Sequence, residues 1–240
     1  MLCRIFNIGN THVQIADLEE NGTLSPLESV DTAAFHPENY KTPVMAAASV
    51  VPDLEKAMRS LGAFIVSPSD ACGPVDLSLM KHPETLGADR LANAAELIFS
   101  GTLPALCADF GTAVNLELVD EKGRMRGGSI LPGRMLLRKA LHDYTAKLPM
   151  TGICSGHTDF PGNCTVDAID IGCDTGAVGA VREILIEAER KYPGLRKIAC
   201  GGDAPFFLKF LNGFELADQM FTLRGIAGIW KMQSAVTKSE

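Results

Sequence analysis

Short apolar runs alternate with amphipathic segments along most of the chain. Residues 44–51 and 105–108 are continuous apolar runs, which are typical of buried strands. Residues 88–99 and 176–191 instead carry apolar residues at the spacing of one face of a helix, with charged residues opposite in the second segment. Because strand and helix patterns alternate, the chain is predicted to adopt an α/β fold.

The other predicted elements are shorter. Pro52 ends the first apolar run, and Asp53 is predicted to be the N-cap of a helix over residues 53–61. Further strands are predicted at residues 63–66, 116–119, 129–131 and 198–200. The last strand leads into Gly201-Gly202 and then a helix rich in Phe.

The chain contains an internal repeat. "FNIGNTHVQIADLEENG" (6–22) and "ADFGTAVNLELVDEKG" (108–123) both read as strand, Gly-containing turn, alternating strand and acidic Gly turn. Asn7 aligns with Asp109 and Asn10 with Thr112. Either turn alone is explained as a tight β-hairpin. The pair, with Gly201-Gly202 after a third strand, favours a duplicated fold whose backbone amides bind phosphate in a nucleotide cleft between two halves.

Composition limits the class of function. The chain has 240 residues, of which 46% are hydrophobic, which is enough for one large domain or two small ones. The net charge of −7 argues against nonspecific nucleic-acid binding, which needs a basic surface. The longest apolar runs are too short for a transmembrane helix, and the first residues lack the pattern of a signal peptide. We therefore expect no membrane and no nucleic-acid partner.

The chain has seven cysteines and no CxxC pair. This usage is typical of thiols in a reducing compartment, so we expect a cytoplasmic protein. The densest set of zinc-ligand residues is Cys154, His157, Cys164 and Cys173. Their spacing matches no standard zinc module, and ordinary core or loop cysteines are the favoured interpretation.

A series of motifs resembles the type III pantothenate kinase family, within the superfamily of acetate and sugar kinases, Hsp70 and actin. The motifs follow the family's order almost from end to end, although none is decisive alone. They are "NIGNT" (7–11), "SVVP" (49–52), "LGADR" (86–90), "DFGTA" (109–113), "GRMRGGSILPG" (123–133), "TAKLP" (145–149), "NCTVDAIDIG" (163–172) and "CGGDA" (200–204).

The resemblance implies two RNase H-like (actin-like ATPase) domains, residues 1–103 and 104–240, with ATP bound in the cleft between them. It implies ATP-dependent phosphorylation of pantothenate to 4'-phosphopantothenate, the first step of coenzyme A biosynthesis. The implied cofactors are ATP with Mg²⁺ and a monovalent cation, K⁺ or NH₄⁺. The implied assembly is a homodimer that binds pantothenate near its interface.

The resemblance also implies roles for individual residues. Asp89 matches the family's proton acceptor, and Asp109 matches the ligand of the monovalent cation. The matching substrate-binding residues are Met80, Gly87, Ala88, Asp89, Arg90 and Thr165. The matching ATP-binding residues are Asn7, Ile8, Gly9, Asn10, Thr11, His12, Val13 and Gln14 in the first phosphate loop, and Thr112 in the second.

The residues themselves leave structural explanations open. An Asp at the start of a helix is also a common N-cap, and an adjacent Arg can simply form a surface ion pair. Phosphoryl transfer needs mainly positioned groups and neutralised charge, so Asp89 as base and Arg90 as substrate ligand suit that chemistry. Thr165 is the weakest assignment, because an isolated Thr in a loop is usually solvated.

Four positions depart from the family pattern. The family has Asp where Asn7 stands, and that Asp helps to position the Mg-nucleotide. It usually has Tyr at Met80, and Thr and Asp at Asn115 and Glu117. Asn7 keeps the shape of Asp but loses its charge, so we expect weakened use of Mg-ATP without harm to the fold.

Three functions follow from this pattern. The first is a pantothenate kinase with a weakened or rearranged metal site, which the retained Asp89, Arg90, Asp109, Thr112 and Thr165 favour. The second is a catalytically degenerate homologue with a regulatory role like that of the Bvg accessory factor proteins, which Asn7 and Met80 favour. The third is a kinase of another small metabolite, since a fold does not determine a substrate.

Overall fold

The computed structural model describes residues 1–69, 71–153 and 159–237. The chain divides into two compact units, the first formed by Met1–Cys107, Glu117–Gly127 and Ala217–Glu240 and the second by Ala108–Leu116 and Gly128–Leu216. The expected assignment of residues 1–103 and 104–240 to two duplicated domains stays a prediction. None of the helices within the described residues is long and apolar enough to cross a membrane.

The first unit contains a five-stranded sheet in the order β3-β2-β1-β4-β5. Strand β1 pairs antiparallel with β2, so that Asn7 lies opposite Gln14, and it pairs parallel with β4. Its apolar residues Cys3, Ile5, Phe6 and Ile8 are buried and lie on both faces of the sheet, which is expected for a central strand covered by helices. The strands are β1 (Cys3–Ile8), β2 (His12–Leu18), β3 (Leu24–Asp31), β4 (Met45–Ser49) and β5 (Phe64–Ile65).

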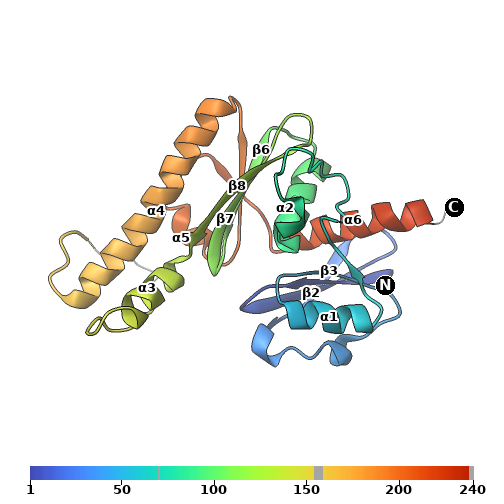
Figure 1. The fold of residues 1–240 in the computed structure, drawn as a ribbon, viewed down its shortest axis with the longest axis horizontal. Coiled ribbons are helices and arrows are strands. Elements are labelled where there is room, and N and C mark those ends of the chain that lie inside the picture. Colours follow the sequence, from blue (N-terminus) through green and yellow to red (C-terminus); the bar gives the residue numbers. More distant parts are fainter. Residues whose placement is uncertain (70, 154–158, 238–240) are drawn as a thin grey trace. The chain divides into compact units, whose positions relative to one another are not determined.

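Helices cover this sheet. Helix α1 (Pro52–Ser60) packs on β4 and β5, whereas α2 (Ala88–Phe99) and α6 (Phe221–Thr237) lie side by side and pack on β4 (Figure 1). Thr222 on α6 donates a 2.7 Å hydrogen bond to the side chain of Asn93 on α2. A core cluster that includes Phe6, Ile15 and Met58 fills part of this unit. This packing holds β1, β2 and α2, which carry the ends of the first predicted phosphate loop and the predicted residues Ala88, Asp89 and Arg90.

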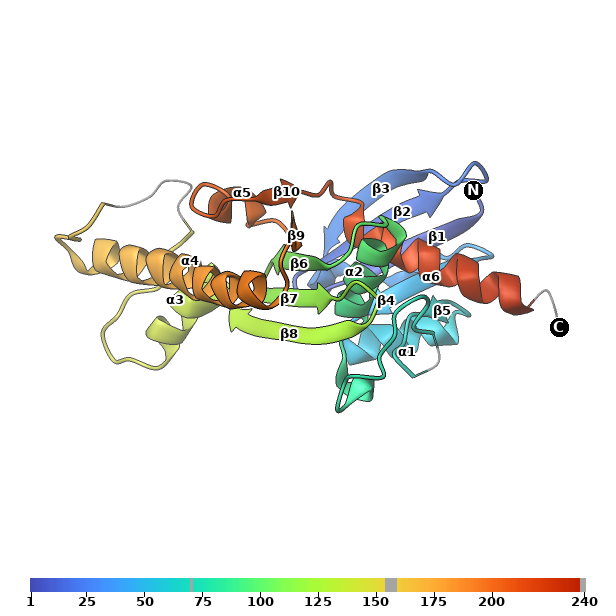
Figure 2. The same cartoon turned by 90° about the horizontal axis from the view of Figure 1, so that it is seen from above.

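The second sheet repeats the topology of the first. Its order is β10-β9-β6-β7-β8, so β6, β7, β8, β9 and β10 occupy the places of β1, β2, β3, β4 and β5. Figure 2 shows β6, β7 and β8 side by side. The strands are β6 (Ala105–Phe110), β7 (Ala113–Val119), β8 (Met125–Pro132), β9 (Arg196–Cys200) and β10 (Phe214–Leu216). The duplicated fold expected from the repeat is therefore confirmed at the level of strand order.

The second unit carries three helices, α3 (Arg134–Asp143), α4 (Thr165–Lys191) and α5 (Ala204–Phe207), and α3 packs against α4. Short 3-10 helices in the first unit cover Thr32–Ala34, Pro37–Tyr40 and Pro83–Thr85. Gly133 precedes α3 and Asp203 precedes α5. Both helices thus begin directly after glycine-containing turns at the ends of strands.

Several expected elements need correction. Asp53 is not the N-cap of α1, because Pro52 occupies the first turn and Val51 is the cap residue. The long helix begins at Thr165, eleven residues before the expected 176, since Cys164 caps it through its sulfur. Thr165 is therefore helical and not in a loop. The sequence patterns did not predict β3, β10, α3 or α6.

Candidate active site

The first predicted phosphate loop is a tight turn between β1 and β2. The Gly9 N–H donates to the His12 carbonyl at 3.0 Å, which closes the turn over Asn10 and Thr11. The Thr32 hydroxyl donates to the Gly9 carbonyl at 2.8 Å and holds the turn from β3's end. Asn10 and Thr11 are exposed, so the turn presents polar groups to solvent on a rigid base.

Asn7 lies in the ladder beneath this turn. Its side-chain Nδ2 donates to Gln14 Oε1 at 3.0 Å, across the register that pairs the two residues. Its Oδ1 is buried and has no hydrogen-bond partner among the residues that the structure describes. A buried acceptor without a partner is costly, so this oxygen is a place where a bound water or ion would be stabilised.

The start of α2 carries the predicted base. Gly87 is the N-cap residue, so Asp89 lies within the first turn and does not cap the helix. Its Oδ1 accepts the N–H of Arg90 at 2.8 Å. A Cβ on Gly87 would lie 2.6 Å from this same Oδ1, so the absence of a side chain at Gly87 allows the carboxylate to take its place.

Asp89 and Arg90 have distinct electrostatic surroundings. Burial raises the pKa of Asp89, and the Arg90 N–H and guanidinium oppose that rise. Arg90 Nε donates to Glu117 Oε1 at 2.7 Å, and Glu117 is fully buried. Sequence reasoning noted only that Glu117 keeps a charge, whereas the structure shows that it fixes Arg90.

The loop at Gly9 and the start of α2 both lie next to Val50, at the end of β4. The Val50 N–H donates to the Ile8 carbonyl at 3.0 Å, and a Cβ on Gly87 would lie 3.7 Å from Val50 Cγ1. The fold thus brings residues about eighty positions apart in sequence to neighbouring strand and helix ends. Met80 is partly buried in the segment before Pro83–Thr85, and its N–H donates to Leu77.

In the second unit, Asp109 lies near the end of β6 and Thr112 lies in the turn between β6 and β7; residues 109–112 are called the Asp109–Thr112 loop below. Gly111 N–H donates to the Ala113 carbonyl at 3.0 Å, two residues on, whereas Gly9 in the first loop donates three residues on, to His12. Gly133 packs on this turn, because its N–H donates to Thr112 O at 3.0 Å and a Cβ there would lie 2.5 Å from Thr112 O. In both turns a Gly N–H closes the loop, but the second turn is one residue tighter than the first.

The turn after β9 packs on the same loop. Gly201 has φ +88°, and a Cβ there would lie 2.5 Å from Asp109 Oδ1 and from the Phe110 carbonyl. The Asp203 N–H donates to that Phe110 carbonyl at 2.9 Å. Glycine is required at position 201 because both the positive φ and the close approach exclude a side chain.

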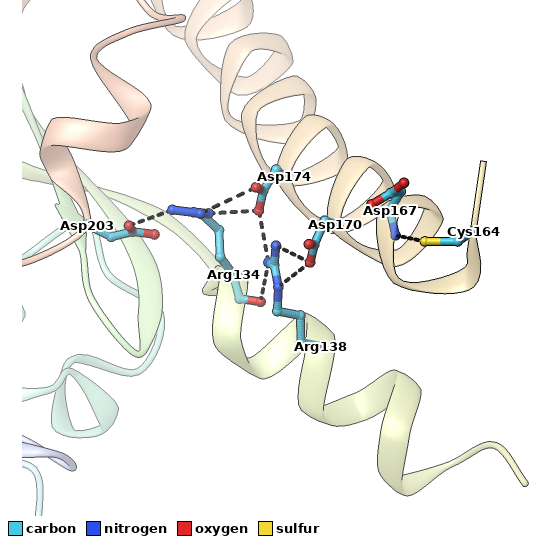
Figure 3. Close-up of polar contacts among 7 residues, drawn as sticks. All are labelled: Arg134, Arg138, Cys164, Asp167, Asp170, Asp174 and Asp203. Atoms are coloured by element: carbon cyan, nitrogen blue, oxygen red, sulfur yellow. Dashed lines mark hydrogen bonds and ion pairs between the residues drawn. The ribbon is translucent and has the colours of Figure 1, made fainter. Parts of the chain in front are cut away.

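Thr165 is the first residue of α4 and is exposed. Cys164 Sγ accepts the N–H of Asp167 at 3.4 Å, as Figure 3 shows. Cys164 thus acts as a helix cap and Cys173 is buried in α4. Cys154 and His157, the other members of the cysteine and histidine set, lie outside the described residues.

A buried charge network joins α3, α4 and the β9–α5 turn (Figure 3). It contains two arginines and three aspartates: Arg134, Arg138, Asp170, Asp174 and Asp203. Sequence reasoning did not identify it. The available signal was the spacing of four between the two arginines and between two of the aspartates, which places each pair on one helical face.

The clearest cavity is apolar and lies between α3, α4 and neighbouring strand residues. Its volume is about 700 Å³, and its lining includes Leu137, Leu141, Tyr144, Ala177 and Val181. None of the predicted substrate or nucleotide residues lines it. Its lining is not suited to a charged substrate, since such sites need a few well-placed polar groups.

Comparison with known proteins identifies the same family that the motifs resemble. The family model described as type III pantothenate kinase matches residues 5–187. The type III pantothenate kinase of Rubrobacter xylanophilus is 35% identical over 202 residues, covering 80% of this chain and 76% of that protein. The type III pantothenate kinase of Methylacidiphilum infernorum is 30% identical over 233 residues, covering 92% and 85%.

Solved structures agree on the fold. A Baf family protein from Campylobacter jejuni superposes with a TM-score of 0.67 at 19% identity, covering 97% of this chain and 99% of that chain. The activator of 2-hydroxyisocaproyl-CoA dehydratase from Clostridium difficile, with bound ADPNP, gives a TM-score of 0.52 at 11% identity, covering 99% and 98%. At such low identity these likenesses concern the fold alone.

Proposed function

Because the chain belongs to the type III pantothenate kinase family, a family of phosphotransferases, we propose that it transfers the γ-phosphate of ATP to pantothenate. The product is 4'-phosphopantothenate, a precursor of coenzyme A. The observation that carries this proposal is the start of α2, where Gly87 makes room for a carboxylate of raised pKa beside an arginine held by a buried glutamate.

In this proposal Asp89 accepts the proton of the primary hydroxyl of pantothenate. The hydroxyl oxygen forms a bond to the γ-phosphorus, the bond between that phosphorus and the bridging oxygen breaks, and ADP leaves. A raised pKa makes Asp89 a stronger base than an ordinary aspartate. Arg90 binds a polar group of the substrate, and Gly87, Ala88, Met80 and Thr165 complete the substrate residues.

ATP binding is assigned to the two turns, residues 7–14 and Thr112. Their backbone amides and hydroxyls suit phosphate oxygens, as in other phosphate-binding turns. Asp109 is proposed to bind the monovalent cation, K⁺ or NH₄⁺. The cleft expected between the two turns stays a prediction.

The first turn suits Mg²⁺ that is bound mainly by phosphates and water, and not Mg²⁺ held directly by several protein side chains. Among the described residues, no group of three or more His, Cys, Asp or Glu side chains is placed to hold a metal ion. Mg²⁺ in kinase sites is bound mostly by substrate phosphates and water, with one or two protein oxygens. The buried Asn7 Oδ1, which lacks a partner among the described residues, is a suitable neutral oxygen for a metal-bound water. When bound, Mg²⁺ neutralises charge on the phosphates.

The proposal extends to a homodimer in the cytoplasm. The apolar cavity beside α3 and α4 supports dimerisation, because the exposed Tyr144 lines it, and because Ile130 on β8 and Leu136 on α3, next in sequence to the lining residues Leu131 and Leu137, are exposed as well. A second copy of the chain is the occupant that we propose for this surface.

The decisive experiment is an assay of ADP formation and of 4'-phosphopantothenate by mass spectrometry, with ATP, Mg²⁺ and K⁺ present. We expect pantothenate-dependent turnover that falls when K⁺ is replaced by Na⁺ or when Mg²⁺ is chelated. The Asp89→Asn protein is the matched inactive control. A folded protein that binds ATP but forms no phosphopantothenate would contradict the proposal.

The two alternatives have less support. The likeness to the Baf family protein concerns the fold alone, whereas the curated relatives at 30% identity or more are kinases. Turnover with another hydroxyl acceptor, and none with pantothenate, would favour the kinase of a different metabolite. A panel of small sugars and hydroxy acids in the same assay separates these outcomes.

A further inference from the structure

Four members of the charge network, Arg134, Arg138, Asp170 and Asp174, are buried, and the fifth, Asp203, is partly buried. Arg134 and Arg138 are 1% and 0% exposed. Arg138 bonds to Asp170 at 3.0 Å and to Asp174 at 2.9 Å, both on α4. Burying ion pairs removes hydration that their mutual attraction only partly replaces, so such a network is weak evidence for a stabilising role alone.

Arg134 differs from Arg138 in the elements that it joins. Its Nε and Nη2 donate to the two oxygens of Asp174 at 2.8 and 3.3 Å, and its Nη1 donates to Asp203 at 2.9 Å (Figure 3). Its guanidinium carbon also lies 3.4 Å above the ring centre of Phe206 on α5. Arg134 therefore joins the turn between β9 and α5 to α4, whereas Arg138 joins only α3 to α4.

The turn that Arg134 holds is the one that packs on the Asp109–Thr112 loop. The Asp203 N–H donates to Phe110, Gly201 lies against Asp109 and Phe110, and Gly133, the residue before Arg134, donates to Thr112. Arg134 is therefore linked to the loop in two ways. Its neighbour in sequence, Gly133, contacts the loop, and its guanidinium binds Asp203, whose turn also contacts the loop. A shift of the turn would reach the loop directly, since close-packed backbone leaves no space to absorb it.

We propose that Arg134 is a positioning residue for the nucleotide: it holds the Gly201–Asp203 turn against the Asp109–Thr112 loop and so sets the affinity for nucleoside triphosphate. The proposal rests on the proposed function, which assigns ATP to this loop. Arg134 also favours an anionic ligand electrostatically. It pairs with the Asp203 carboxylate and so neutralises a negative charge that would repel phosphate.

The test compares Arg134→Lys with Arg138→Lys. Both substitutions keep one positive charge on the same buried helix face, but a lysine lacks the fork that bonds two aspartates at once. We expect Arg134→Lys to weaken ATP and ADP binding, measured by calorimetry without pantothenate, by about tenfold or more. Arg138→Lys should bind nucleotide as the parent protein does. In kinetics, the KM for ATP should rise in Arg134→Lys while the KM for pantothenate stays within about twofold.

Asp203→Asn keeps the proposal testable if Arg134→Lys does not fold. Asp203 is more exposed than the arginines, and the amide still accepts a hydrogen bond from Arg134 but carries no charge. Asp203→Asn alone should also weaken ATP binding, because its contact with Arg134 loses its charge. Where Arg134→Lys folds, the double variant should bind ATP no more weakly than Arg134→Lys alone if Arg134 acts through Asp203, because the two effects are then not additive. Circular dichroism confirms that each variant is folded at the temperature of the binding experiment.

The outcomes separate this proposal from the proposed function. A parent protein that binds ATP but does not phosphorylate pantothenate contradicts the proposed function, and the binding data then still decide the role of Arg134. Equal nucleotide binding by the parent protein, Arg134→Lys and Asp203→Asn overturns the positioning role. Equal losses in Arg134→Lys and Arg138→Lys overturn it as well, since they point to general damage of α3 and α4. A parent protein that binds no nucleotide overturns both proposals.

Discussion

Asp89 combines a partly buried carboxylate with a backbone hydrogen bond from the next residue. The replacement Asp89→Asn removes the proton acceptor but keeps the size of the side chain. We expect turnover to fall by at least about 100-fold, in the range of a lost general base, with ATP affinity nearly unchanged. Asp53→Asn is the matched control, because Asp53 is also in the first turn of a helix but is exposed. Unchanged turnover in Asp89→Asn would leave Asp89 a structural residue.

The raised pKa of Asp89 also predicts the pH dependence. The base must be ionised, so kcat/KM should fall as the pH drops through the pKa of Asp89, and this should occur above the ordinary value of about 3.9. Since the native state disfavours the ionised carboxylate, Asp89 lowers stability as the pH rises through its pKa. Asp89→Asn should therefore be slightly more resistant to thermal unfolding at pH 7 than at pH 4, each relative to the parent. A kcat/KM profile that falls only at the ordinary aspartate pKa would contradict the predicted pH dependence.

Asn7→Asp introduces the carboxylate that the family resemblance implies at this position. A carboxylate and a unit positive charge about 4 Å apart attract by roughly 4 kcal/mol at an effective dielectric near 20. We expect tighter Mg-ATP binding and faster turnover, by about tenfold if about 1.4 kcal/mol of this attraction is realised. Gln14 already lies within hydrogen-bond distance, and its amide can turn to donate to the new carboxylate. The magnesium dependence of ATP binding measures the effect.

Asn39→Asp controls for the added charge, because Asn39 is exposed in the same unit but lies outside the proposed phosphate loop. It should not reproduce the gain. If Asn7→Asp binds Mg-ATP no better and turns over no faster, then Asn7 and Gln14 have adapted to each other as a neutral pair. That result would also remove the expectation that Asn7 weakens Mg-ATP use.

At the scale of an element, the start of α2 depends on a glycine. In Gly87→Ala the new Cβ would lie 2.6 Å from Asp89 Oδ1, which is the end of a flexible side chain. The fold should tolerate the change within about 1 kcal/mol, whereas the displaced carboxylate should lower kcat by about tenfold. Gly179→Ala is the control, since nothing lies within 4 Å of a Cβ there and alanine favours a helix. Full activity of Gly87→Ala would show that the Asp89 rotamer in this structure is not required.

Elements also differ in how far their sequence determined them. Helix α2 was predicted with its observed bounds, because its apolar residues recur at helical spacing and Gly101-Thr102-Leu103-Pro104 follows its end. The start of α4 was missed, because its glycines, aspartates and threonines in the first three turns resemble a loop. Packing of α3 on α4 and the buried arginine and aspartate pairs explain why that segment is nevertheless helical.

At the scale of the whole molecule, the proposed homodimer predicts a concentration-dependent mass in sedimentation equilibrium. Ala140 lines the apolar cavity and is exposed, so Ala140→Glu would place a charge in the proposed interface. We expect dimerisation to weaken by about 2 kcal/mol or more. Ala33→Glu, on an exposed residue of the first unit, is the control. A parent protein that stays monomeric at the highest concentration reached would exclude the dimer.

The sequence alone determined the family, the α/β class and the duplicated strand-turn-strand unit, because these depend on local patterns and on the order of motifs along the chain. It also indicated Asp89, Arg90, Asn7 and Asp109 as site residues. Only the tertiary structure decided which groups act on them. The pairing of Arg90 with Glu117, and of Arg134 with Asp174 and Asp203, joins residues 27, 40 and 69 positions apart. No local pattern encodes such pairs, since burial of charge becomes favourable only when distant segments bring its partners together.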